Sequence, residues 1–222
     1  MAYSKGMQIM ANLELELNEK LKTLLKQTAL CITEQQQNQL VKLVLLLHKW
    51  NKAYNLTAVR DPMEMLVKHI MDSIVVSPYL QGHKFIDVGT GPGLPGLPLA
   101  IINPDKHFVL LDSLGKRISF IRNAVRELQL TNVESVLSRV EEYTPSQLFD
   151  GILSRAFTSL KNMTDWCKHL PAPNGLFYAL KGIYNQQEVI ELGNKFQTIE
   201  VIKLNIPDLI GERHLVLLKR TV

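Results

Sequence analysis

Phe85-Ile-Asp-Val-Gly-Thr-Gly-Pro-Gly-Leu-Pro-Gly96 is the stretch that decides the fold, because a short apolar strand runs through an acidic residue into a glycine-dense turn. Two patterns overlap in it: acidic-x-Gly-x-Gly-x-Gly from Asp87 to Gly93, and Gly-x-Gly-x-x-Gly from Gly91 to Gly96, the dinucleotide fingerprint. Glycine permits positive φ and lets a ligand approach the backbone closely. The stretch therefore predicts a cofactor-binding turn, and the two patterns imply different cofactors.

The side chains of this turn discriminate between those cofactors. A pyrophosphate is bound by backbone N–H groups at the start of a helix, but Pro92 and Pro95 have no N–H, and the carboxylate of Asp87 would repel the anion. S-adenosylmethionine carries no phosphate, and a carboxylate attracts its sulfonium and α-ammonium groups. We therefore predict that the turn binds S-adenosylmethionine through Asp87, Gly89 and Gly91.

A second acidic residue ends the next predicted strand, His107-Phe-Val-Leu-Leu-Asp112. The second strand of a nucleotide-binding fold offers a carboxylate to ribose hydroxyls at this place. A nicotinamide enzyme requires an acid at the same spacing, so Asp112 does not discriminate between the two cofactors. A helix N-cap is an equally good interpretation, because Ser113, Gly115 and a helical run follow.

Length and composition predict a globular protein. The 222 residues, 46% of them hydrophobic, are sufficient for one sizeable α/β domain with an extension. The longest apolar run near the N-terminus, 43–47, is too short to span a membrane, and no signal-peptide core precedes it. We therefore expect a cytoplasmic monomer without membrane contact. Cys31 and Cys167 lie too far apart to indicate a metal clamp, so we expect buried thiols and no metal.

The net charge of +4 is compatible with a nucleic-acid partner and also with an ordinary basic enzyme. The distribution of charge is more informative than the total. Cations gather in two stretches with few acids among them, and the residues are Lys49, Lys52, Arg60, Lys68 and His69, then Lys116, Arg117, Arg122 and Arg126. Each cluster taken alone is interpreted equally well as a solvated helix face.

The first 80 residues predict helices. Apolar residues recur at helical spacing over 13–25 and 40–50, and each stretch marks a buried stripe. Thr33 with Gln36 matches a capping box, and a second follows at 61–64 with proline at the first helical position. We predict three helices that begin at their own caps.

From residue 81 onward, strands alternate with helices. The predicted strands span 84–88, 108–112, 133–137, 151–155, 176–181, 198–204 and 214–219. This alternation favours a mostly parallel, Rossmann-like sheet of seven strands covered on both faces. No clear helix separates the last two strands, which predicts a hairpin and an antiparallel edge strand, as in class I S-adenosylmethionine-dependent methyltransferases. We predict an N-terminal helical extension, 1–80, packed on a methyltransferase domain, 81–222.

The chain resembles the glucose-inhibited division protein B family of bacterial 16S rRNA guanine-N7 methyltransferases. The resemblance rests on Asn51-Lys-Ala-Tyr-Asn-Leu-Thr57, the glycine turn and Gly211-Glu-Arg-His214, with further matches at 46–50, 68–73, 111–117, 138–142, 154–156 and 179–182. Roughly 170 residues take part, so the combination is far more specific than any single motif. It implies methyl transfer to N7 of guanine 527 in the 530 loop of 16S rRNA, with that rRNA or the small ribosomal subunit as partner.

The same resemblance assigns cofactor contacts, at Gly89, Leu94, Val140, Glu141 and Arg155. Each position also has a local interpretation. Val140 and Glu141 lie where such folds place an adenine edge, and a solvated helix start is the alternative. Arg155 ends a buried strand at the crevice where open α/β sheets bind ligands. Its alternative role is an ion pair with Asp150 or Glu141.

The residues after the fourth predicted strand bear on the methyl acceptor. Enzymes that methylate exocyclic amines commonly carry Asn/Asp-Pro-Pro-aromatic there, whereas this chain has Ser154-Arg-Ala-Phe157. Methylation of cytosine C5 requires a cysteine nucleophile, and neither cysteine follows a proline at a strand end. Guanine N7 has a free lone pair, so no proton must be removed and we nominate no catalytic acid or base. Proximity and alignment would supply the rate enhancement.

The residues that face RNA are less defined by the sequence. N7 lies on the Hoogsteen edge, so the base is reached best in a loop or after extrusion. Candidates for RNA contact are Asn55, His69, Asp72, Lys116, Arg117, Arg155 and Lys181. His69 and Asp72 share a helix face, and a structural pair is as good an interpretation as substrate contact. The rival functions are a nicotinamide oxidoreductase that uses 91–96 and a ribosome-assembly factor without turnover.

Overall fold

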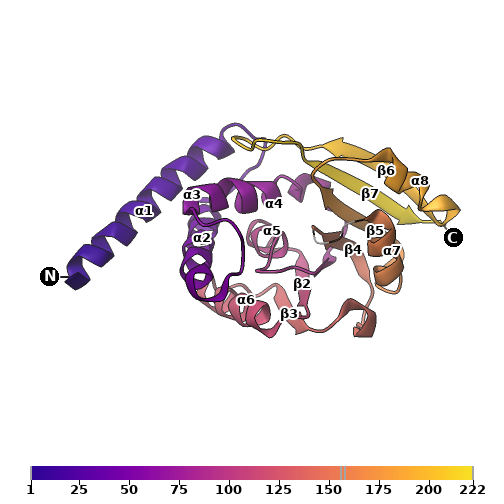
Figure 1. The fold of residues 1–222 in the computed structure, drawn as a ribbon, viewed down its shortest axis with the longest axis horizontal. Helices are drawn as coiled ribbons and strands as arrows, with labels where there is room; N and C mark the ends of the chain where they lie inside the picture. The colour runs from indigo at the N-terminus through magenta and orange to yellow at the C-terminus, as the bar shows by residue number, and fades with distance from the viewer. Residues whose placement is uncertain (1, 156, 158, 222) are drawn as a thin grey trace.

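A seven-stranded sheet forms the centre of the molecule (Figure 1). The computed structural model describes residues 2–155, 157 and 159–221. The strand order is β3-β2-β1-β4-β5-β7-β6. The strands are β1 Lys84–Val88, β2 His107–Asp112, β3 Val133–Leu137, β4 Phe149–Ser154, β5 Pro171–Lys181, β6 Phe196–Lys203 and β7 His214–Arg220. β1 to β5 are parallel, whereas β7 is antiparallel to both β5 and β6.

All seven predicted strands are present, but the antiparallel strand is not at the edge. β7 lies between β5 and β6, and β6 is the edge strand. The reason is visible in burial: 215–218 of β7 are buried without interruption, so this strand needs cover on both faces. β6 has no buried residue and suits an edge. The predicted hairpin between these last two strands is confirmed.

Helices cover both faces of the sheet. The longer ones are α1 Ala2–Leu25, α2 Glu34–Tyr54, α5 Gly96–Ile102, α6 Gly115–Glu127 and α7 Leu160–Cys167, and shorter segments are α8 Gln186–Ile190, Ser77–Tyr79, Val140–Glu142 and Gly193–Lys195. One hydrophobic cluster joins α1, α2, α5 and α6 to Phe85, Phe108 and Tyr178, and a second joins α7 to the other face. Phe85 and Phe108 stack at 5.4 Å between ring centroids. The N-terminal helices and the sheet thus share one core.

The caps of the N-terminal helices agree with the sequence, but the third helix changes character. Thr33 and Gln36 form the reciprocal capping box, and the Asp61 side chain accepts the backbone N–H of Glu64. After α3, Pro62–Met65, the backbone continues as a π-helix, Leu66–Met71, and then as α4, Asp72–Ile74. Wide turns of this type are rare and often lie at functional sites.

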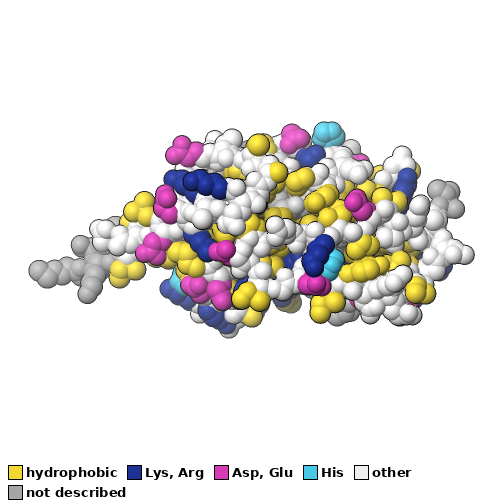
Figure 2. Space-filling view, turned by 90° about the horizontal axis from the view of Figure 1, so that it is seen from above, with side chains coloured by type: hydrophobic (Ala, Val, Ile, Leu, Met, Phe, Trp, Pro, Cys, Tyr) yellow, Lys and Arg dark blue, Asp and Glu magenta, His cyan; other side chains and the backbone are white. Residues whose placement is uncertain are grey.

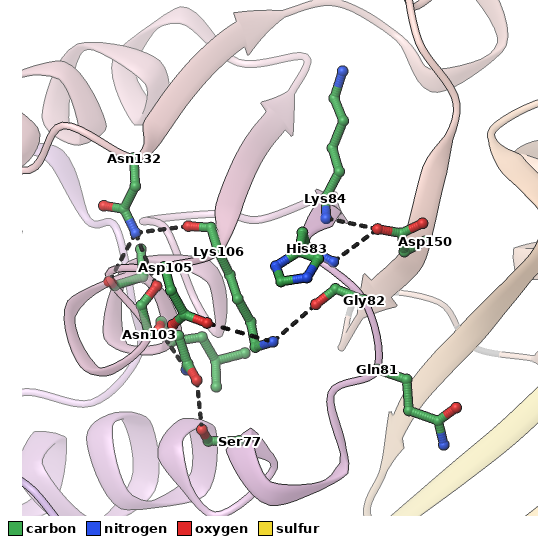
Figure 3. Close-up of polar contacts among 12 residues, drawn as sticks. Ser77, Gln81, Gly82, His83, Lys84, Asn103, Asp105, Lys106, Asn132 and Asp150 are labelled. Atoms are coloured by element: carbon green, nitrogen blue, oxygen red, sulfur yellow. Dashed lines mark hydrogen bonds and ion pairs between the residues drawn. The ribbon is translucent and has the colours of Figure 1, made fainter.

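A polar network holds the amino-terminal edge of the sheet (Figure 3). The side-chain amide of Asn132 donates to three backbone carbonyls at 2.9 to 3.1 Å. One carboxylate oxygen of Asp150 accepts the backbone N–H groups of His83 and Lys84 at 2.8 and 2.9 Å. These contacts tie the starts of neighbouring strands together at the edge opposite the glycine turn.

Candidate functional site

Two cavities open at the carboxyl-terminal edge of the sheet, where ligands bind in open α/β folds. The first, of about 380 Å³, is lined by Gly89 after β1, Asp112 at the end of β2, and Val140 and Glu141 after β3. Trp166 and Phe157 form part of its wall, with their rings 5.6 Å apart. Four residues predicted from the sequence, in three separate segments, therefore surround one space.

The backbone N–H groups of the glycine turn are hydrogen-bonded within the protein. Those of Gly89 and Thr90 bond to the carbonyl of Leu111, and those of Gly93 and Leu94 to the carbonyl of Thr90. The remaining three, at 91, 96 and 97, bond to the Asp112 carboxylate, the Asp87 carboxylate and the carbonyl of Gly93. Because the two prolines have none, the described residues 89–97 leave no N–H for a pyrophosphate. The lack of free N–H groups argues strongly against a dinucleotide cofactor at this turn.

Asp87 supports this turn through hydrogen bonds and does not line the first cavity. Its side chain is fully buried, and one carboxylate oxygen accepts the Thr90 hydroxyl at 2.7 Å and the Gly96 N–H at 2.8 Å. Burial raises the pKa of Asp87 to about 6, although both hydrogen bonds oppose the shift. Gly91 and Leu94 are likewise buried in the turn. These three predicted residues hold the turn that carries Gly89 and do not themselves line the cavity.

Asp112 organises the turn after β2. Its carboxylate accepts the Gly91 N–H at 2.9 Å and the Leu114 N–H at 2.9 Å, and it pairs with Arg117 at 3.1 Å. The N-cap of α6 is Leu114, which provides no side-chain bond, so the N-cap interpretation of Asp112 is wrong. Asp112 is 2% exposed and is among the residues that line the cavity.

Arg155 lies in the second cavity, of about 430 Å³, and does not line the first. Its guanidinium donates to Asp72 at 3.0 Å, so the alternative role, an ion pair with Asp150 or Glu141, is not found. Arg213 donates to the other oxygen of the same carboxylate, also at 3.0 Å. Asp72 is 5% exposed, and it therefore links the helical extension to β4 and to the segment before β7. Ala156, part of the predicted acceptor motif, lies outside the described residues.

Sequence reasoning missed Arg213 and Trp166. Arg213 belongs to the Gly211-Glu-Arg-His214 match, which was the available signal, but its partner is 141 residues away. Trp166 gave no signal, because the sequence alone does not fix how its helix, α7, packs against the sheet. Of the other RNA-facing candidates, Lys181 lines the second cavity and is paired with Glu188 at 3.0 Å.

His69 is held neutral at the wall of the second cavity. It is 8% exposed, and Nε2 lies 2.8 Å from the Thr57 hydroxyl. Nδ1 is buried and has no hydrogen-bond partner among the described residues. Burial, and then the charge of Arg155, lower the pKa of His69 to about 4. His69 and Asp72 face one cavity, but the carboxylate bonds to the two arginines and not to the imidazole.

This histidine makes stability depend on pH. The unfolded imidazole binds a proton below about pH 6.5, whereas the folded one resists until about pH 4. Its contribution to stability is complete above pH 6.5 and is lost as the pH falls toward 4. Asp87, whose folded pKa is raised, acts oppositely between pH 6 and 4. Comparison of the wild type with His69→Gln cancels the Asp87 effect, because both proteins contain that carboxyl.

When the pH falls from 7 to 5, we expect the free energy of unfolding of His69→Gln to increase by about 2 kcal/mol relative to that of the wild type. Urea unfolding at the two pH values measures this difference. His169→Gln, which removes an exposed histidine, is the matched control and should follow the wild type. Parallel pH profiles for wild type and His69→Gln would contradict the assignment of a neutral buried His69.

The described residues, 2–155, 157 and 159–221, contain no group of three His, Cys, Asp or Glu side chains arranged to hold a metal ion. None of their helices has the length and apolar character required to cross a membrane. Cys167 is buried, and burial raises its pKa to about 12, while Cys31 is exposed, contrary to the expectation of two buried thiols.

Solved structures of low sequence identity share this fold. A SAM-dependent methyltransferase from Aquifex aeolicus matches with a TM-score of 0.55 and 16% identity, over 69% of this chain and 92% of that one. N-methyltransferase NodS from Bradyrhizobium japonicum WM9, in complex with S-adenosyl-L-homocysteine, matches with a TM-score of 0.55 and 12% identity, over 78% and 98%. The sheet order and the glycine turn are those of the class I S-adenosylmethionine-dependent methyltransferase fold, and the chain has this fold.

Relatives of high sequence identity define the family more narrowly than the fold does. "Ribosomal RNA small subunit methyltransferase G" of Pasteurella multocida (strain Pm70) is 75% identical over 210 residues, which are 95% of this chain and 100% of that protein. The protein of the same name from Mannheimia succiniciproducens is 76% identical over 208 residues, 94% and 98% of the two chains. Residues 36–216 match the family described as rRNA small subunit methyltransferase G. The chain belongs to this family.

Proposed function

We propose that the protein transfers a methyl group from S-adenosylmethionine to N7 of a guanine in 16S rRNA, at position 527 in the 530 loop. Family membership supports the class of reaction and the RNA. The observation that carries the proposal is the pair of cavities at the ends of adjacent strands β1 and β4. One is suited to the methyl donor and the other to the base.

The first cavity suits S-adenosylmethionine because its lining offers different chemistry to different parts of that molecule. Bound there, the cofactor supplies a methyl group on a positively charged sulfur. We assign Asp112 to the ribose hydroxyls, since its carboxylate borders the cavity while Arg117 and two N–H groups hold it in place. Val140 provides an apolar edge for adenine, and Gly89 a close approach of backbone to ligand. Glu141 completes this wall.

The second cavity suits a guanine that needs no activation by a base. His69 is neutral at physiological pH and its Nε2 is occupied by Thr57, so it is not available as a general base. Asp72 is engaged by two arginines. We assign these groups to positioning of the extruded base, with Arg155 and Arg213 as donors toward its oxygen or the adjacent phosphate. Orientation next to the methyl donor then supplies the acceleration.

Binding of the cofactor should be visible in tryptophan fluorescence. Trp166 lines the first cavity, whereas Trp50 packs between Tyr54 and Phe120 in the helical extension. We expect S-adenosylhomocysteine to change the emission of Trp166 in a saturable manner. The change should persist in Trp50→Phe and disappear in Trp166→Phe, while calorimetry still detects binding in both. A signal that follows Trp50 instead would contradict the placement.

Methyl transfer in vitro tests the function itself. Naked 16S rRNA, an assembly intermediate and the complete small subunit are each incubated with labelled S-adenosylmethionine, and the modified base is mapped. We expect one N7-methylguanine.

Mass spectrometry of 16S fragments from a deletion strain tests the rival assembly-factor function, because N7-methylguanine at its full level would overturn the enzymatic proposal. We also propose that the protein is cytoplasmic and that it is a monomer; sedimentation would check the oligomeric state.

A further inference from the structure

Two segments of the chain are free of acidic residues. Residues 35–60 contain no Asp or Glu, and neither do residues 113–126. Both segments are rich in cations, which are Lys42, Lys49, Lys52 and Arg60 in the first and Lys116, Arg117, Arg122 and Arg126 in the second. The absence of acids over such lengths produces a positive surface only if the fold brings the segments together.

The fold places them side by side, in α2 and α6. Lys116, at the start of α6, donates to the carbonyl of Tyr54, at the end of α2, at 3.1 Å. At the other end, Lys42 donates to the carbonyl of Glu127 at 2.7 Å. Between them, the rings of Trp50 and Phe120 lie 5.6 Å apart. The two helices therefore run antiparallel, and the end of α2 meets the start of α6.

Four cations surround this meeting point: Lys49, Lys52, Arg60 and Lys116, which we call the basic ridge. Arg60 donates to the carbonyl of Asn51 and, at 2.8 Å, to the side chain of Asn55, so it is fixed against the end of α2. Among the described residues, none of the four has a carboxylate within ion-pair distance, whereas Lys42 and Arg117 do. All four are exposed.

Stabilisation of helix α2 does not account for the whole ridge. A helix C-terminus carries about half a negative charge and interacts favourably with cations in its last turn. Arg60 and Lys116 already contact carbonyls there. Lys49 lies more than a turn from the end of the helix, and no contact of its side chain is found in the described structure. A net positive surface remains after the helix end is neutralised.

Two residues of the ridge are sequence neighbours of cavity residues. Lys116 precedes Arg117, which lines the first cavity, and Arg60 follows Val59, which lines the second. Tyr54 lies among the four cations with 46% of its surface exposed. By contrast, the face shown in Figure 2 intersperses acidic and basic side chains. Cations around an exposed aromatic ring are the combination that binds single-stranded RNA, through phosphates and stacked bases.

We propose that the basic ridge binds the phosphates of the RNA strand that flanks the target guanine, with Tyr54 as a stacking surface for a neighbouring base. The inference rests on the proposed function and adds to it the surface that holds the substrate outside the two cavities. Such contacts position the RNA without reading its sequence. They also predict a specific salt dependence, since each phosphate contact on a single strand contributes about −0.7 to the slope of log K against log salt.

The test compares Lys49→Gln/Lys52→Gln with Lys26→Gln/Lys195→Gln, a control that removes two exposed charges elsewhere. Affinity for a 16S fragment containing the 530 loop is measured without methyl transfer, over a range of salt concentrations. We expect the ridge variant to bind about 10-fold more weakly at low salt, and its slope to be smaller by about 1.4. We expect Tyr54→Ala to weaken binding while leaving the slope unchanged. The control should match the wild type.

Affinity for S-adenosylhomocysteine and the unfolding midpoint are measured for every variant, and both should remain at their wild-type values. Wild-type affinity and slope in the ridge variant would overturn the inference, and so would an equal loss in the control. Lost cofactor affinity or stability in the ridge variant would also overturn it, because the lysines would then act within the fold. Failure of the proposed function is separate: the wild type itself would not methylate the fragment or any larger 16S substrate.

Discussion

Gly89→Val is expected to lower the affinity for S-adenosylhomocysteine by about 100-fold or more, which corresponds to at least about 2.7 kcal/mol of binding free energy. Gly89 borders the first cavity directly after β1, and its N–H is already bonded to the carbonyl of Leu111. A branched side chain at this point would occupy ligand space and could not move aside, because the turn around it is buried and fully bonded. Calorimetry with S-adenosylhomocysteine measures the loss.

Backbone strain must be separated from this steric effect. Gly89 has φ of 66°, so valine there also adopts an unfavourable conformation. Gly193→Val is the matched control: its φ is 58°, nothing lies within 4 Å of the added Cβ, and it is in the turn before β6. We expect both variants to remain folded and to lose similar stability, with cofactor affinity lost only in Gly89→Val. Unchanged affinity in Gly89→Val would refute the placement of the cofactor.

The arrangement of strands was accessible from the sequence because each strand carries its own signal. β1 and β2 are short apolar runs, with Asp87 one residue before the end of β1 and Asp112 at the end of β2, and parallel strands covered on both faces require such runs. The position of β7 inside the sheet was not accessible, since pairing with β5 is a long-range choice. Only the uninterrupted burial of 215–218 reveals it.

The residues at the glycine turn were predicted as a set but not by role. The spacing of glycines and acids placed Asp87 and Asp112 at one edge, yet only the structure shows that both carboxylates bond to the turn and that Asp112 alone also lines the first cavity. The local pattern indicates which groups lie near this edge of the sheet. It does not record which N–H group each carboxylate satisfies.

The second cavity was largely hidden from sequence reasoning. The ordinary capping pattern at Asp61 begins α3, and the π-helix that follows at Leu66–Met71 has no cap of its own and no local cause in its residue types. The partners of Asp72 are 83 and 141 residues away. Arg155 was predicted to contact the cofactor, with an ion pair to Asp150 or Glu141 as the alternative, whereas its ion-pair partner in the structure is Asp72 from the helical extension. The acceptor side of the site is thus built by tertiary packing, whereas the donor side is encoded in one continuous turn.

Asp72→Asn is expected to reduce methyl transfer by about 100-fold while leaving the affinity for S-adenosylhomocysteine unchanged. The carboxylate holds Arg155 and Arg213 at 3.0 Å each and is almost fully buried, so it fixes both guanidinium groups. Asparagine keeps the shape but provides one acceptor, turns an N–H group toward an arginine, and leaves two positive charges uncompensated. Asp72 is a positioning residue in this account. The reduction should appear in kcat more than in KM, because a misplaced base still binds through its flanking strand.

Glu64→Gln is the control for Asp72→Asn, since Glu64 lies two turns earlier in the same helical segment and pairs with Lys68 at 3.1 Å on the surface. We expect it to retain wild-type activity, because an exposed pair contributes little. Asp72→Glu should recover part of the lost kcat, as it restores the charge with imperfect geometry. Methyl transfer within threefold of wild type in Asp72→Asn would refute the positioning role. A parallel loss of cofactor affinity would instead show that Asp72 supports the donor cavity, and that the two cavities are coupled through Arg155, whose charge already acts on buried Asp87.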